Sequence, residues 1–202
     1  MKFYEFQKKM QKSLFSIQEA KIVSGDPQGM TLKLQLHQWE KKGLLVRLKR
    51  GLYGFPEERP EPIHMAKVLY SPAYVSLEYA LHFYGLIPDV VFSMTLVTPK
   101  TTRTFHTPYG QFIYHKMRQD LFWGYDPTTL MGEREKVIAD YCYLRSGQLK
   151  PESQFWETLR WQNLQEVNFK ELFSIAEKFD SKKVVALVQS LQNYTETQHG
   201  KN

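Results

Sequence analysis

Polar and cationic side chains are concentrated between residues 30 and 50, and their types suit contact with nucleic acid. The amide of Gln38 can form two hydrogen bonds with the edge of an adenine, and Thr31 and Leu34 can contact the methyl group of a thymine. Lysine and arginine neutralise backbone phosphates without reading the base sequence. The candidate DNA-binding residues are Thr31, Lys33, His37, Gln38, Lys41, Lys42, Arg47, Lys49 and Arg50.

A second group of residues has the types found in metal-dependent nucleases. His106, His115 and Asp120 fall on or near one predicted hairpin. The spacing between the two histidines, however, matches no standard metal-ligand or acid–base motif. Interpreted as a nuclease site, the cluster predicts metal-dependent cleavage that is lost in His115→Ala. The leading interpretation is that the chain is not an enzyme.

The remaining candidates for a metal-binding or catalytic role are three carboxylates and one thiol. Glu133, Glu135 and Asp140 are compatible with a divalent cation, yet acidic residues at the start of a helix usually complement its dipole. Cys142 falls inside a predicted helix, where a buried and inert thiol is the ordinary case. No phosphate-binding glycine loop, zinc-binding helix or nucleophile elbow occurs in the sequence. We therefore expect no catalytic residue, no metal and no cofactor.

Three predicted helices position the candidate DNA-binding residues. The first is indicated by an apolar stripe at helical spacing, formed by Phe3, Phe6, Met10 and Leu14. Ser16 and Glu19 have the spacing of a capping box, so a second helix is expected to begin after Ser16 and to end near residue 23. The third helix is indicated by one apolar face before Gly43, formed by Leu32, Leu36 and Trp39.

After the third helix the pattern changes to that of a β-hairpin. One set of alternate residues, Leu44, Val46 and Leu48, is apolar, and the other set contains Leu45, Arg47 and Lys49. Gly51 then turns the chain back toward Tyr53. This order of elements is that of a winged helix, in which the third helix enters the major groove of DNA and the hairpin contacts the backbone. Two alternatives remain open: a charged helix face can simply be solvated, and a winged helix can bind protein instead of DNA.

The distribution of charge favours the DNA interpretation. The net charge of the chain is +6, and residues 1–59 contain 12 lysines and arginines against 6 acidic residues, whereas residues 60–202 contain 15 of each kind. The whole excess of positive charge therefore lies in the first segment. This is expected of a nucleic-acid-binding module that is joined to a neutral domain.

A polar, proline-containing linker over residues 57–62 divides the chain into two predicted domains. We expect a winged helix-turn-helix DNA-binding domain over residues 1–59 and an α/β domain over residues 63–202. The second domain is predicted to contain helices over 63–70 and from Ser76 to Gly85, a strand over 90–98 and a hairpin formed by 101–106 and 111–117. The fold class is therefore α+β: an N-terminal winged helix-turn-helix followed by a mixed α/β domain with a helical C-terminal part.

The helical C-terminal part is predicted from residue 133 onward. One helix is expected to end at Gly147, two or three more to follow as far as Tyr194, and residues 195–202 to form a frayed tail. The lysine-rich N-terminus lacks the apolar segment of a signal peptide. The most apolar stretch, over residues 79–99, is interrupted by Asp89 and by prolines. The sequence thus predicts a cytoplasmic protein without a membrane segment.

Four sequence features occur in the same order as in a known family. They are the basic-Gly-x-Tyr wing at residues 47–53, the run at 74–81 that leads to Gly85 and Leu86, the stretch 98–103 with Gly110, Phe112, Tyr114, Phe122 and Gly124, and a helix with Glu135, Lys136 and Asp140. In these features the chain resembles the AbiEi-type antitoxins of bacterial abortive-infection (type IV) toxin–antitoxin systems.

The resemblance implies a protein with two roles. It implies a repressor of its own operon, which binds promoter repeats in double-stranded DNA through the winged helix. It also implies that the second domain counters a cognate nucleotidyltransferase-like toxin. The alternative is a stand-alone winged-helix transcriptional regulator that senses a ligand or a protein partner through the same domain.

Overall fold

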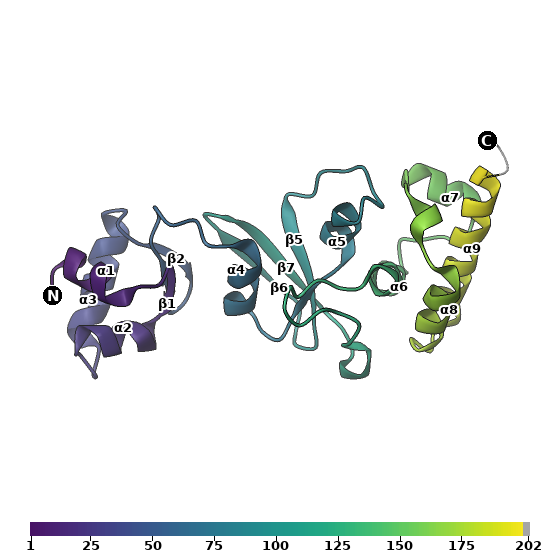
Figure 1. Ribbon diagram of the computed structural model, residues 1–202. Coiled ribbons are helices and arrows are strands. Elements are labelled where there is room, and N and C mark those ends of the chain that lie inside the picture. Colours follow the sequence, from purple (N-terminus) through teal and green to yellow (C-terminus); the bar gives the residue numbers. More distant parts are fainter. Residues whose placement is uncertain (200–202) are drawn as a thin grey trace. The chain divides into compact units, whose positions relative to one another are not determined.

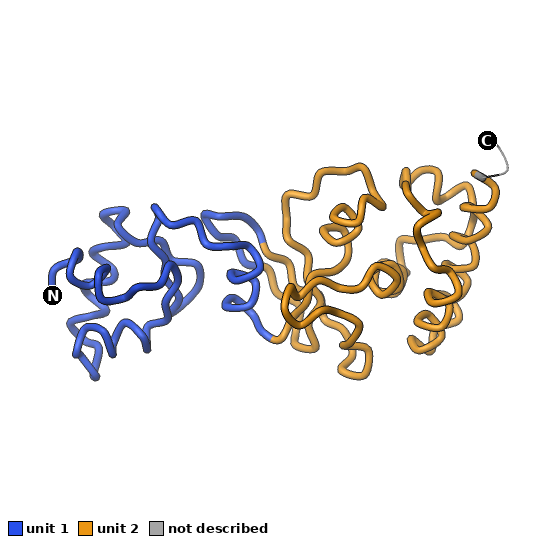
Figure 2. Tube along the Cα trace, in the orientation of Figure 1, with its two compact units in different colours: residues 1–71, 105–111 blue, residues 72–104, 112–202 orange. Residues whose placement is uncertain are grey.

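A computed structural model of the chain describes residues 1–199. The chain forms two compact units, shown in different colours in Figure 2. Unit 1 contains residues 1–71 together with 105–111, and unit 2 contains residues 72–104 and the chain from 112 onward. The predicted fold class is confirmed: N-terminal helices with a small antiparallel sheet precede a second sheet and C-terminal helices.

Unit 1 has the order of elements of a winged helix. Its small sheet is antiparallel, with β3 between β1 and β2, and Phe15 of β1 lies opposite Tyr53 of β3. Helix α3 precedes the β2–β3 hairpin, which is the wing. The elements are α1 (Phe3–Met10), β1 (Leu14–Ser16), α2 (Ile17–Ser24), α3 (Met30–Lys41), β2 (Val46–Lys49), β3 (Leu52–Gly54) and α4 (Pro62–Leu69).

The core of unit 1 is aromatic. The Phe6 ring centroid lies 5.3 Å from that of Phe15 and 5.0 Å from that of Trp39, which are distances typical of favourable aromatic pairs. The prediction that one face of α3 packs inward is confirmed, because Leu32, Leu36 and Trp39 are all buried. The core therefore fixes which face of α3 is left to solvent.

The predicted extent of the first helix is wrong. Helix α1 ends at Met10, Gln11 adopts a left-handed conformation with φ of 52°, and Leu14 begins strand β1. Leu14 lies four residues after Met10, a spacing that fits a helical stripe equally well. Both Leu14 and Phe15 are buried, so this three-residue strand lacks the alternation by which a strand is recognised in a sequence.

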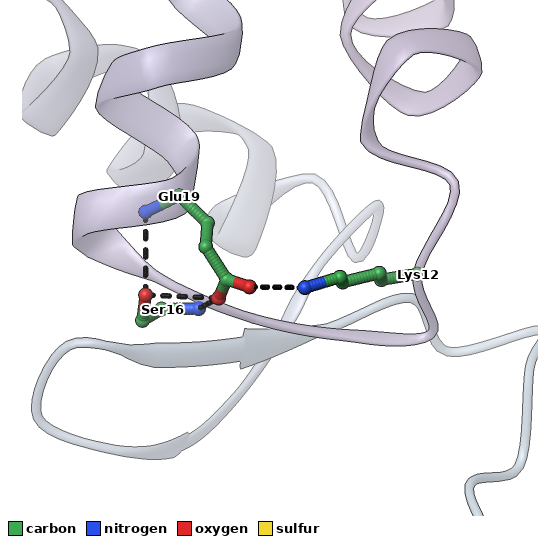
Figure 3. A network of polar contacts seen from close by, with 3 residues as sticks. All are labelled: Lys12, Ser16 and Glu19. Atoms are coloured by element: carbon green, nitrogen blue, oxygen red, sulfur yellow. Dashed lines mark hydrogen bonds and ion pairs between the residues drawn. The ribbon is translucent and has the colours of Figure 1, made fainter.

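The predicted capping box at the start of α2 is confirmed (Figure 3). The Ser16 hydroxyl accepts a hydrogen bond from the Glu19 amide at 3.2 Å, and the Glu19 carboxylate accepts one from the Ser16 amide at 2.8 Å. The Lys12 ammonium donates to the other carboxylate oxygen at 2.5 Å. These contacts, first that with Lys12 and then that with the Ser16 amide, lower the pKa of Glu19 from 4.5 to about 2.

This pKa makes the capping box sensitive to pH. Because folding lowers the pKa of Glu19, the stabilisation is complete above pH 4.5 and is lost as the pH falls toward about 2. We expect Glu19→Gln to melt at a lower temperature than the wild type at pH 7, and the difference to narrow progressively below pH 4.5. Thermal unfolding of both proteins at pH 7, 4 and 3 measures this difference in melting temperature. A difference that does not change with pH would contradict this role of the carboxylate.

The chain leaves unit 1 after α4 and returns to it at residues 105–111 (Figure 2). Within unit 1, the Tyr109 hydroxyl donates a hydrogen bond to the Phe55 carbonyl at 3.1 Å. The ring of Phe105 packs against that of Tyr70, with centroids 6.0 Å apart. Residues 105–111 thus contribute their own contacts to the unit that carries the winged helix.

The second sheet has the strand order β4-β5-β7-β6. Helix α6, labelled in Figure 1, packs against α5, α8 and α9. The hairpin predicted over residues 101–106 and 111–117 is present and is formed by β6 and β7. The elements after α4 are β4 (Tyr74–Val75), α5 (Leu77–Phe83), β5 (Ser93–Thr98), β6 (Arg103–Thr107), β7 (Gly110–Lys116), η1 (Gln119–Leu121), α6 (Arg134–Leu144), α7 (Ser153–Thr158), η2 (Leu164–Glu166), α8 (Phe169–Glu177) and α9 (Lys182–His199).

Two predicted boundaries in this part of the chain need correction. The strand expected from Val90 begins at Ser93, and the side chains of Val90 and Phe92 are exposed. The tail expected from residue 195 is helical as far as residue 199, because α9 continues its apolar face and Thr195 is buried. The remainder of the expected tail, residues 200–202, lies outside the described residues.

A buried ion pair lies at the centre of unit 2. The ammonium of Lys136 pairs with the carboxylate of Asp140 one turn later on α6, and both side chains are fully buried. Asp140 also accepts hydrogen bonds from the hydroxyls of Tyr74 at 2.7 Å and Ser76 at 2.9 Å. Burial raises the pKa of Asp140 and lowers that of Lys136, and the pairing opposes both shifts.

Candidate nucleic-acid interface

The solvent-exposed face of α3 carries the candidate groove residues. It lies opposite the buried Leu32, Leu36 and Trp39, as the helical repeat of about 100° per residue requires. The exposed residues of the helix are Met30, Thr31, Lys33, Leu34, His37, Gln38 and Lys41. All the α3 residues that the sequence predicts to contact DNA are therefore exposed to solvent.

The N-terminus of α3 is held by a side chain that the sequence prediction did not single out. Gly29 occupies the capping position with φ of 70°, and it has no side chain that could cap the helix. Asp26 caps it instead, because its carboxylate accepts hydrogen bonds from the amides of Gly29 at 2.8 Å and Leu32 at 3.1 Å. The hydrogen bond from Gly29 is the main cause of the lowered pKa of Asp26. The available signal was an aspartate before proline in a turn, a position at which such side chains bind nearby backbone amides.

Of the three basic side chains of the wing, the two arginines are exposed to solvent and the lysine is partly buried. Arg47 and Arg50 are exposed, whereas Lys49 is half-buried. The Lys49 ammonium donates hydrogen bonds to the carbonyls of Val68 at 3.0 Å and Leu69 at 2.6 Å, at the end of α4. The pairing of β2 with β3 shifts register between Arg47 and Lys49. Strict alternation is lost at this irregularity, and the sequence alone did not reveal it.

A cleft of about 630 Å³ lies between α2, α3 and the wing. The wing turn is joined to the start of α2 by a hydrogen bond from the Ile17 amide to the Gly51 carbonyl at 2.9 Å. Within the described part of the chain, every charged residue that lines the cleft is basic, and none of these side chains forms an ion pair. The lining residues are Ile17, Gln18, Lys21, Lys33, Arg47, Arg50, Gly51 and Tyr53.

The cleft joins residues that are far apart in the sequence. The sequence prediction included Lys33, Arg47 and Arg50, but it did not include Gln18 and Lys21 of α2. No local pattern marks these two, because they join the others only once the wing folds against α2. Four cationic groups around one open cleft create a positive potential, which attracts phosphate groups and other anions.

The histidine cluster considered as a nuclease site is not assembled as a metal site. The Nε2 atom of His115 lies 3.4 Å from the guanidinium of Arg145, which forms an ion pair with Glu78. Burial, and then Arg145, lower the pKa of His115. Asp120 pairs with Arg118 on the surface. Among residues 1–199 no group of three or more histidines, cysteines and carboxylates has the arrangement of a metal site.

The remaining candidates for chemistry lie in the core or apart from one another. Asp140 belongs to the buried ion pair with Lys136, so it is not available to form a cation site with Glu133 and Glu135. Cys142 is fully buried, and burial raises the pKa of its thiol to about 12. The thiol is therefore protonated at neutral pH and is a poor nucleophile.

None of the helices that the structure describes combines the length and the apolar character needed to cross a bilayer.

No curated protein matches the chain significantly. A family match does cover the segment that contains β1, α2, α3, β2 and β3, which are the elements that form the cleft and the exposed face of α3. Residues 9–56 match the family described as transcriptional regulator, AbiEi antitoxin.

Proposed function

We propose that the chain is an autoregulatory transcriptional repressor that binds its own promoter through the winged helix of unit 1. The observation that carries the proposal is the cleft, where Lys21, Lys33, Arg47 and Arg50 surround a space next to the exposed face of α3. In this arrangement α3 enters the major groove while the cleft and the wing receive the phosphates of one strand. The transcriptional-regulator family that matches residues 9–56 supports the same role.

The proposal divides the candidate residues by what they contact. Gln38 and Thr31 lie on the groove face of α3 and contact base edges. The exposed cations at the ends of α3 and on the wing contact phosphates: Lys33, Lys41, Lys42, Arg47 and Arg50. His37 lies on the same exposed face as Gln38. Lys49 supports the wing by binding the carbonyls at the end of α4 rather than reaching a phosphate.

Binding to a labelled fragment from upstream of the chain's own gene tests the repressor role. We expect specific binding to be about 10³-fold tighter or more than binding to a shuffled fragment of equal length, as is typical of specific DNA-binding proteins. In a reporter strain, the chain should repress the same promoter. Equal affinity for both fragments, with no repression, would contradict the proposal.

We further propose that unit 2 provides the antitoxin role, by countering a nucleotidyltransferase-like toxin encoded next to this gene in the same operon. The support for this part is the antitoxin description of the family that matches residues 9–56, together with the resemblance of the second half of the chain. Co-expression of the neighbouring gene with the full chain should restore growth that the neighbouring gene alone arrests. Promoter binding without growth rescue would identify a stand-alone regulator. Both roles place the protein in the cytoplasm.

A further inference from the structure

The first turns of α3 expose apolar side chains where the proposed function places base edges. Met30 is 77% exposed and Leu34 is 59% exposed. They are four residues apart, so they lie next to each other on the face opposite the core. His37, Gln38 and Lys41 continue this face toward the C-terminus of the helix. The N-terminal half of the exposed face therefore carries two apolar side chains beside Thr31 and Lys33, and its C-terminal half is polar.

The charges around the apolar pair favour a polyanion as its partner. The exposed residues of α3, all of them described, include no acidic side chain. Lys33 connects the helix to the basic cleft, and Lys41 and Lys42 are exposed at its end. An apolar partner groove on another protein would leave these cations without complementary charge. DNA supplies the negative charge, and the N-terminal residues of a recognition helix are those that contact base edges.

In the major groove the main apolar group on a base edge is the C5-methyl group of thymine. We propose that Met30 and Leu34 bury thymine methyl groups and that these contacts determine part of the sequence preference of the chain. The inference rests on the proposed DNA-binding function and adds the chemical group that is recognised. It also gives a role to the two exposed residues of α3 that cannot form hydrogen bonds with bases through their side chains.

The experiment compares promoter fragments that differ only in methyl groups. One fragment is amplified with dTTP and the other with dUTP and uracil-containing primers, which removes every thymine methyl and keeps the base-pairing groups. For the wild type we expect uracil DNA to bind about fourfold more weakly for each methyl group that is buried. The Met30→Ala, Leu34→Ala double variant should bind both fragments with nearly equal affinity.

Tyr4→Ala is the matched control, because Tyr4 is an exposed apolar side chain of α1, 73% accessible. It should retain the full difference between thymine and uracil DNA. An equal difference in all three proteins would mean that uracil acts through the shape of the DNA, and it would overturn the inference. Equal binding of both fragments by the wild type would overturn the inference and leave the repressor role intact. No binding to either fragment would overturn both.

Discussion

Replacing Asp140 by alanine is expected to lower the free energy of unfolding of unit 2 by about 3–5 kcal/mol. The change leaves the Lys136 ammonium fully buried without its counter-ion. It also removes the acceptor for the hydroxyls of Tyr74 and Ser76. Urea denaturation followed by tryptophan fluorescence measures the loss, because three of the four tryptophans belong to unit 2.

A variant in which both charges are removed separates the ion pair from simple packing. Lys136→Met with Asp140→Leu removes two charges together, and such replacements in protein cores are often neutral or stabilising. We expect this double variant to be more stable than Asp140→Ala. Adding Tyr74→Phe should increase the stability further, because it removes a buried hydroxyl whose partners, Lys136 and Asp140, have been replaced. A loss below about 1 kcal/mol in Asp140→Ala would contradict the role of the pair, since such a value is typical of exposed ion pairs.

Neutralising the four cations of the cleft is expected to have the largest effect on DNA binding. Each cation that neutralises one phosphate contributes about 0.9 to the slope of log affinity against log salt concentration. Changing Lys21, Lys33, Arg47 and Arg50 to glutamine should therefore reduce the slope by about 3.6. Affinity near physiological salt should fall by two to three orders of magnitude, on the order expected for four lost phosphate contacts.

Two controls make this result specific to the cleft. Changing four exposed lysines of unit 2 to glutamine lowers the net charge equally and should leave the slope almost unchanged: Lys150, Lys170, Lys182 and Lys183. Lys49→Met should lower thermal stability, because the carbonyls of Val68 and Leu69 lose their donor, with little change in the slope. If the unit 2 variant reduced the slope as much as the cleft variant, net charge would explain the binding.

Local patterns were sufficient to predict most of unit 1. Helical spacing identified the face of α3 formed by Leu32, Leu36 and Trp39, and the pair Ser16 and Glu19 identified the start of α2. These signals act over three or four residues, which is the range that a sequence pattern records directly. The exposed face of α3 could be predicted as well, because it lies on the side of the helix opposite the buried face.

Features that depend on distant segments could not be predicted in this way. The environment of Lys49 is decided by the end of α4, some twenty residues later in the chain, and Lys21 joins the cleft only through the fold of the wing. Lys136 and Asp140 have the same spacing as an ordinary surface ion pair. Only the packing of Tyr74 and the other core residues of unit 2 around them turns that pair into a buried one.

Because residues 105–111 belong to unit 1, they restrict how the domains of this protein can recombine in evolution. The bond from Tyr109 to the Phe55 carbonyl and the packing of Phe105 on Tyr70 come from a segment that follows the first residues of unit 2. Recombination that joined residues 1–71 to an unrelated partner would leave these contacts behind. Unit 1 is therefore not formed by one continuous segment of the chain. We expect the winged helix and the β6–β7 hairpin to be inherited together.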